Sequence, residues 1–96
     1  MRWKQLGTVA ALDVAARHVV RWRGAVIDCG ERSQHKRMLE LIADNDRLDL
    51  GAFMRDAGFG SVGTLRKAIS TLNQHIKTHR FSVNEPNNLL LVKLVT

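Results

Sequence analysis

Cysteine, proline and aromatic residues are scarce in this 96-residue sequence, which has one cysteine, one proline, two tryptophans, three phenylalanines and no tyrosine. The lone Cys29 excludes an internal disulfide and is typical of a protein from a reducing compartment. So few aromatic side chains argue against a stacking platform for single-stranded nucleic acid. No run reaches the roughly 18 apolar residues of a membrane span, and "MRWKQLGTVAAL" lacks the long apolar run of a signal peptide. These absences predict a cytoplasmic protein without a membrane segment.

Acidic residues are missing from one long part of the chain. The whole sequence carries 15 Lys/Arg and 9 Asp/Glu, a net charge of +6, but no Asp or Glu occurs between Ser61 and Val83. Residues 61–96 hold five Lys/Arg and one Asp/Glu, a net charge of +4, whereas residues 36–60 hold four and five, a net charge of −1. This asymmetry predicts a polyanion-binding face, most often one for nucleic acid. The alternative is a basic surface that only keeps the protein soluble.

Residues 1–30 favour short strands. Two β-branched clusters, Val19-Val20 and Val26-Ile27, flank "RWRG", in which Gly24 can supply a turn conformation. Trp3–Leu6 and Val9–Leu12 are further strand candidates, whereas the alanines of "ALDVAAR" also suit a turn of helix.

Three helices are predicted within residues 33–78. The first has Ser33 as its N-cap, the second has Asp49 as its N-cap and is stopped by Gly58 and Gly60, and the longest begins near Ser61. A polar turn, Asp44-Asn45-Asp46, ends the first helix. Apolar residues expected in the core recur at helical spacing in all three helices: Met38, Leu39, Leu41 and Ile42; Leu50, Phe53, Met54 and Ala57; and Leu65, Ile69, Leu72 and Ile76.

The segment "RFSVNEPNNLLLVKLV" predicts a hairpin over residues 80–95. Pro86 suits the second position of its turn, and Asn87 and Asn88 tolerate unusual backbone angles. The order of elements therefore predicts one α+β domain over residues 1–96, a winged helix-turn-helix. The second and third helices form the helix-turn-helix, and the hairpin forms the wing.

The polar face of the third helix offers hydrogen-bond donors and cations. In a helix-turn-helix the second helix lies in the major groove of duplex DNA, with its N-terminal residues at the base edges. The residues expected towards bases are Thr64, Arg66, Lys67, Ser70 and Thr71; those expected nearer the flank or the DNA backbone are Asn73, Gln74 and Lys77. The alternative is a solvated face without a ligand.

The hairpin adds two candidate contacts. Arg80 at its base and Asn87 at its tip are placed to reach a minor groove or flanking phosphates. Glu85 in the turn argues mildly against deep insertion. For Asn87 and Asn88, ordinary turn chemistry is an equal alternative.

From about Leu12 to Val95 the sequence resembles the OmpR/PhoB-type winged-helix effector domain of bacterial response regulators. The segments that carry the resemblance are "LDVAARHVVRWRGAVIDCGERSQHKRMLELIADN", "LDLGAFMRDAG" and "GTLRKAISTLNQHI". The resemblance implies an N-terminal antiparallel sheet, three helices, a C-terminal hairpin, and double-stranded DNA binding through the helix at residues 64–77 by a transcription regulator. It also implies that the loop Phe59-Gly60-Ser61 lies near a site where relatives can touch RNA polymerase.

Three features depart from that family. The final strand reads "NNLLLVKLV" where the family usually has a Gly-Tyr-containing strand, and Asn73, Gln74 and His75 stand where it favours Arg or Lys. No receiver domain is encoded in these residues, so no phosphorylation switch is expected.

An enzyme or a metal protein is the first rival hypothesis. His75 and His79 are four residues apart, which on one helix face suits zinc, but a third ligand is lacking. The acidic residues at 44, 46 and 49 lack the glycine and the terminal glutamate of a calcium loop. We therefore expect no enzymatic activity, no metal and no cofactor.

A protein-interaction module is the second rival hypothesis. "LLLVKLV" is apolar on both faces of a strand, which is typical of a central strand or of an association edge. This pattern predicts a homodimer through the hairpin or the N-terminal sheet. Its stronger form is a winged-helix fold that binds RNA polymerase or another regulator without binding DNA.

Overall fold

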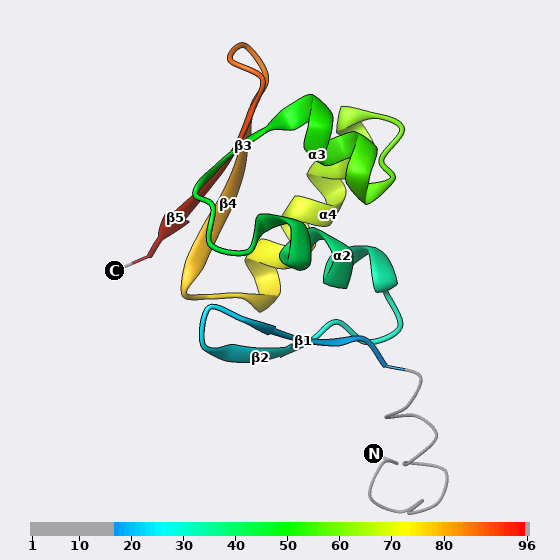
Figure 1. Ribbon diagram of the computed structural model, residues 1–96, viewed down its shortest axis with the longest axis vertical. Coiled ribbons are helices and arrows are strands. Elements are labelled where there is room, and N and C mark those ends of the chain that lie inside the picture. The colour runs from blue at the N-terminus through cyan, green and yellow to red at the C-terminus, as the bar shows by residue number, and fades with distance from the viewer. Residues whose placement is uncertain (1–16, 96) are drawn as a thin grey trace, which may run out of the picture.

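The computed structural model describes residues 17–95 as an α+β structure with three helices and two small antiparallel sheets (Figure 1). The elements are β1 (Val19–Trp22), β2 (Ala25–Asp28), α2 (Ser33–Ile42), β3 (Arg47–Asp49), α3 (Leu50–Ala57), α4 (Val62–His75), β4 (His79–Asn84) and β5 (Leu89–Leu94). The strand candidates Trp3–Leu6 and Val9–Leu12 lie outside the described residues.

The predicted strand pair around Gly24 is confirmed as the β1–β2 hairpin. Arg23 and Gly24 form its two-residue turn, with φ angles of 48° and 83°. Positive φ at both positions matches the right-handed twist of the strands. Arg23 lies over the Trp22 ring and donates to the carbonyl oxygen of Ala43 and to Asp46. These bonds tie the hairpin to the end of α2.

Helix α2 begins one residue earlier than its predicted cap implies. Ser33 is the first helical residue, and the N-cap is Arg32, whose side chain makes no capping bond. The prediction that Ser33 is the N-cap is therefore wrong, because the extended backbone that a cap requires occurs at Arg32. Three of the four residues expected in the core, Met38, Leu39 and Ile42, are fully buried, whereas Leu41 is half-buried.

Both predicted ends of α3 are confirmed. The backbone N–H of Ala52 donates to Asp49 Oδ2 at 2.8 Å, so Asp49 is the N-cap. Gly58 ends the helix in the left-handed conformation, at φ 82°, which glycine adopts without the steric cost of a Cβ. Leu50, Phe53 and Ala57 are buried as predicted, whereas Met54 is half-buried.

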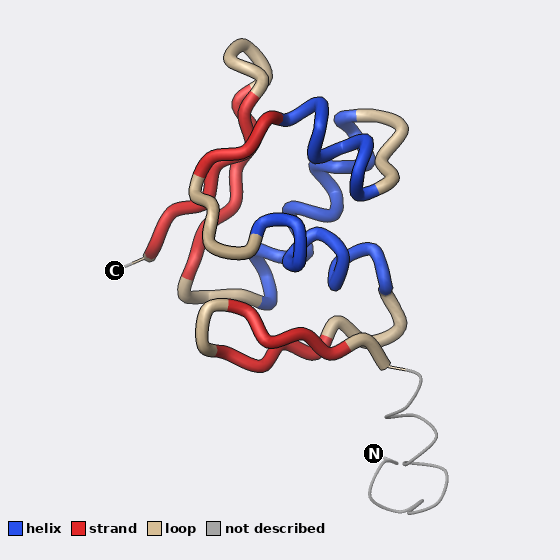
Figure 2. Tube along the Cα trace, viewed as in Figure 1, coloured by secondary structure: helices blue, strands red, loops and turns tan. Residues whose placement is uncertain are grey.

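The strand β3 is absent from the sequence-based prediction. It pairs antiparallel with β5, so the second sheet has the order β3-β5-β4 and β5 is its central strand. Three residues are too short to show an alternating pattern, and their conformation depends on a partner about forty positions later. The helices lie on one side of this sheet (Figure 2), against the buried Leu90, Val92 and Phe81.

The β4–β5 turn is formed as predicted. Asn88 N–H donates to the carbonyl oxygen of Glu85 at 3.0 Å, which places Pro86 at the second position of the turn. Asn88 has φ 54°, a left-handed value that asparagine tolerates.

Helix α4 buries its predicted apolar stripe. Leu65, Ile69, Leu72 and Ile76 are at most 6% exposed, and Ala68 joins them at 7%. Ser61 caps the helix by accepting from the N–H of Thr64 at 3.2 Å. The opposite side of α4 is consequently left for solvent or a ligand.

Candidate nucleic-acid interface

The exposed face of α4 is set by the helical repeat. With about 3.6 residues per turn, Lys67, Ser70 and Gln74 project opposite the buried stripe, and all three are exposed. Arg66 and Lys77 lie on the flank that faces β4, because both line the groove beside that strand. Thr64 and Thr71 lie on the other flank.

A groove separates α4 from β4 and brings together six of the ten predicted site residues. Its apolar lining residues are Ile69, Phe81 and Val83, and its volume is about 490 Å³. The predicted residues that line it are Arg66, Ser70, Asn73, Gln74, Lys77 and Arg80. Thr64, Lys67 and Thr71 are on α4 outside this groove, and Asn87 is in the hairpin turn.

Three cations of this region have no ion pair with any described residue: Lys67, Lys77 and Arg80. All three are exposed. Unpaired cations on a face that includes hydroxyl and amide donors produce a positive potential suited to phosphate.

Arg66 forms an ion pair that the sequence alone does not predict. Its Nη2 lies 2.7 Å from Oε1 of Glu85, and both side chains are about half exposed. Glu85 belongs to the β4–β5 turn, so this ion pair links α4 to the hairpin. The charge of Glu85 was visible in the sequence, but its distance from Arg66 depends on how the two elements pack.

In the structure the side chain of Asn73 braces strand β4, whereas the sequence predicted a contact with the flank or backbone of DNA. Its Oδ1 accepts from the N–H of Phe81 at 2.8 Å, and its Nδ2 donates to the carbonyl oxygen of Phe81 at 2.9 Å. β4 is an edge strand, so alternate backbone groups lack a strand partner. The Asn73 amide satisfies both groups of Phe81, and we therefore leave Asn73 out of the proposed contact surface.

Two threonine hydroxyls of α4 are engaged locally. Thr71 Oγ1 donates to the carbonyl oxygen of Lys67 at 3.2 Å, and Thr64 Oγ1 lies 3.0 Å from Ser61 Oγ. Each hydroxyl oxygen retains a lone pair that can accept a hydrogen bond. Because both hydroxyls are already hydrogen-bonded within the protein, they are less available as donors to a ligand than the sequence implied.

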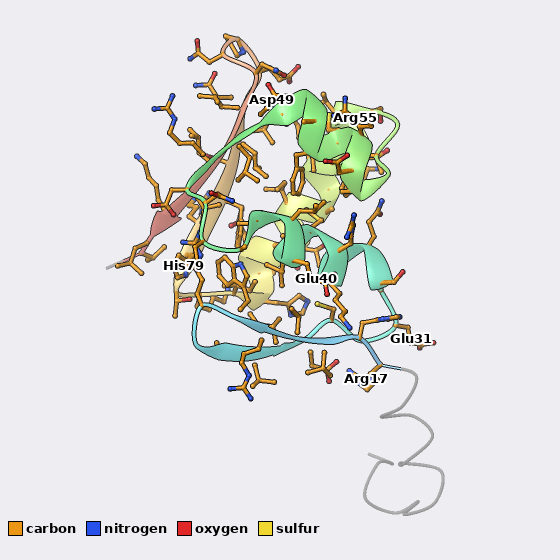
Figure 3. The ribbon with its side chains drawn as sticks, in the orientation of Figure 1. Arg17, Glu31, Glu40, Asp49, Arg55 and His79 are labelled. Carbon is orange, nitrogen blue, oxygen red and sulfur yellow. The ribbon has the colours of Figure 1, made fainter. Side chains whose placement is uncertain are left out.

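The hairpin turn is held against the start of α3. Leu50 N–H donates to the carbonyl oxygen of Asn88 at 2.9 Å, and Asn88 Nδ2 donates to Asp49 Oδ1 at 2.8 Å. Asp49 thus caps α3 and anchors the turn (Figure 3). The side chain of Asn87 makes no hydrogen bond to a described residue, while its N–H donates to Asn84 Oδ1.

The suggested pair of histidines on one helix face is wrong. His75 ends α4, whereas His79 begins β4 and packs edge-on against Trp22. Partial burial lowers the pKa of His79, and the positive charge of Arg23 lowers it further. Among residues 17–95 no three His, Cys, Asp or Glu side chains are grouped as metal ligands.

Within the described part of the chain, no helix has the length and apolar character needed to cross a membrane. Comparison with protein-family models, with curated proteins and with solved structures finds no match to this chain.

Proposed function

We propose that this protein binds double-stranded DNA and regulates transcription, as a winged helix-turn-helix. In this proposal α3, the loop after it and α4 form the helix-turn-helix, and the β4–β5 hairpin is the wing. The observation that carries the proposal is the α4–β4 groove. Arg66, Lys77 and Arg80 all line it, beside the hydrogen-bonding face of α4. Among residues 17–95 no carboxylate lines this groove, although Glu85 pairs with Arg66 from the hairpin turn.

The dimensions of α4 suit a major groove. Its 14 residues at ~1.5 Å each give a length of about 21 Å, and a major groove about 12 Å wide admits one helix. Arg66, Lys67 and Ser70 then approach base edges, with Thr64 and Thr71 beside them. Lys77, Arg80 and Gln74 contact the sugar-phosphate backbone, and Asn87 reaches the flanking DNA from the wing.

A fluorescence-anisotropy titration tests this function. A mixed-sequence duplex of about 30 base pairs is titrated between about 50 and 200 mM salt, and affinity should fall steeply as salt rises. A Lys77→Gln/Arg80→Gln variant should bind more weakly and lower the slope of log affinity against log salt by about two. The control is Arg21→Gln, which removes an exposed cation from the β1–β2 hairpin. No binding by the parent protein at the lowest salt would contradict the proposal.

A second candidate function is protein binding through the outer face of the β3-β5-β4 sheet. No described helix covers this face, and Leu91 lies on it between Arg47 and Ser82. Arg80 stands directly opposite Lys93 on the same face. Like charges in that position are unfavourable, so a partner that supplies carboxylates around an apolar side chain would stabilise the face.

Purified RNA polymerase is the first partner to test for this second function. Binding by the parent and loss of binding in Leu91→Arg, with Arg21→Gln as the control, would support it. Retained binding in Leu91→Arg would exclude this face as the contact.

A further inference from the structure

Glu85 is the one acidic residue between Ser61 and Thr96, and its carboxylate lies against Arg66, a central residue of the proposed DNA-binding helix. A single acid in a strongly basic segment is unfavourable for phosphate binding. Here that acid is directed at the guanidinium group best suited to read a base. General attraction between a basic protein and DNA therefore does not explain why Glu85 lies next to Arg66.

The turn holds Glu85 in a defined position. Pro86 restricts the backbone directly after it, and Asn88 closes the turn by donating its N–H to the carbonyl oxygen of Glu85. Asn88 also bonds Asp49 and Leu50 at the start of α3. The carboxylate is consequently presented to α4 by a braced turn rather than by a free loop.

The ion pair leaves part of Arg66 available. A guanidinium group has five N–H donors, and the bond to Glu85 uses Nη2. The remaining donors can still reach the O6 and N7 acceptors of a guanine, which carry no formal charge. The negative charge of Glu85 therefore repels a phosphate that approaches Arg66 more strongly than it repels an uncharged base edge.

We infer that Glu85 determines sequence discrimination, by holding Arg66 for base contact and by opposing its use as a non-specific phosphate clamp. This inference rests on the proposed DNA-binding function. Glu85 acts through Arg66 and through charge repulsion, so it is a positioning and specificity-determining residue rather than a contact residue.

Two variants and a control separate the positioning of Arg66 from the repulsion of phosphate. Glu85→Gln keeps the side-chain length and removes the charge, so it both releases Arg66 and ends the repulsion. Glu85→Asp keeps the charge but shortens the side chain by one methylene, which withdraws the carboxylate from Arg66. Glu31→Gln is the control, because it removes one acid from the loop between β2 and α2, well away from the hairpin turn (Figure 3).

The measurement compares two duplexes: one selected from a random pool by the parent protein, and a scrambled version of it. We expect Glu85→Gln to bind the scrambled duplex about fivefold more tightly, and to show a salt slope steeper by about one, as for one added phosphate contact. Binding to the selected duplex should change less, so that the affinity ratio falls. Glu85→Asp should also lower the ratio, with a smaller gain on the scrambled duplex, and Glu31→Gln should leave the ratio unchanged.

A nitrogen NMR spectrum of the free protein gives an independent readout. The guanidinium resonances of Arg66 should shift in Glu85→Gln and Glu85→Asp and stay in place in Glu31→Gln. Equal or weaker binding of the scrambled duplex by Glu85→Gln, while the parent binds DNA normally, would overturn the inference and leave the proposed function intact. If neither the parent nor Glu85→Gln bound any duplex at the lowest salt, the proposed function would fail, and the inference with it.

Discussion

Arg66 and Lys77 both line the groove beside α4, yet they are expected to contribute differently to DNA binding. Arg66 lies in the N-terminal half of α4 and is aimed by Glu85, whereas Lys77 lies just past the C-terminal end of the helix with no ion partner among the described residues. In the proposed complex with DNA, position on the helix therefore assigns Arg66 to base reading and Lys77 to phosphate binding.

Arg66→Ala should reduce discrimination at one base pair by about 1 to 3 kcal/mol, because a guanidinium contact to guanine is lost. Lys77→Ala should weaken binding to all sequences alike and lower the salt slope by about one. Anisotropy titrations with a set of single-base-pair variants of a selected duplex measure both effects. Unchanged binding in both variants would show that α4 is not the DNA-contacting helix.

Asn73→Ala should lower the free energy of unfolding by about 1 to 3 kcal/mol, since the N–H and the carbonyl oxygen of Phe81 both lose their partner. Urea unfolding followed by circular dichroism measures this change. Asn87→Ala, which removes a side chain without hydrogen bonds to described residues, is the matched control and should leave stability nearly unchanged. Equal stabilities for the two variants would refute the bracing role of Asn73.

His35 should make stability depend on pH. Burial, with the positive charge of Arg32 nearby, lowers the pKa of His35 from the ordinary value of 6.5. The unfolded chain therefore binds a proton at pH values where folded His35 is neutral. The contribution of His35 to the free energy of unfolding is therefore fully present above about pH 6.5. It is lost as the pH falls from 6.5 towards the lower pKa of the folded state.

Urea unfolding at about pH 7.5 and about pH 5.5 tests this dependence. The parent should lose stability at the lower pH, and His35→Gln should lose less. Some dependence should persist in the variant, because the pKa of His79 is also lowered. An identical pH dependence in the parent and His35→Gln would contradict the assignment to His35.

At the scale of elements, the three-stranded sheet contains an unfavourable cross-strand pair. Arg80 on β4 and Lys93 on β5 are directly opposite each other on the outer face. Lys93→Glu should raise the free energy of unfolding by roughly 0.2 to 1 kcal/mol, as the pair becomes attractive. Thermal unfolding against Lys93→Gln as the uncharged control measures the electrostatic part, and no difference between these two variants would show that the pair is screened by solvent.

At the scale of the whole molecule, the outer sheet face, which no described helix covers, predicts self-association. Leu91 on this face is half-buried, and Val95 just beyond β5 is 50% exposed. We expect a homodimer by light scattering at about 100 µM protein, with association that weakens on dilution. Leu91→Arg should favour the monomer, and Arg21→Gln should not change the mass. A parent protein that stays monomeric at this concentration would exclude the homodimer.

Local signals account for the elements that were predicted correctly. Asp49 caps α3 with its own side chain, Gly58 supplies the left-handed residue after that helix, and the apolar stripe of α4 follows from the helical repeat. Each depends on residues within a few positions of one another, so a single sequence is sufficient to find it. The cap of α2 was misplaced by one residue, because a serine at a helix start also fits the first helical position.

By itself, the sequence determined the α+β composition, the three helices, the β1–β2 and β4–β5 hairpins and the basic, acid-poor character of α4. These follow from capping, periodicity and charge, which are properties of neighbouring residues. Only the tertiary structure decided that Arg47–Asp49 forms a strand, that Asn73 braces Phe81 and that Glu85 holds Arg66. In each of these cases packing brings together groups from different elements, and their pairing energy depends on a distance that no local pattern contains.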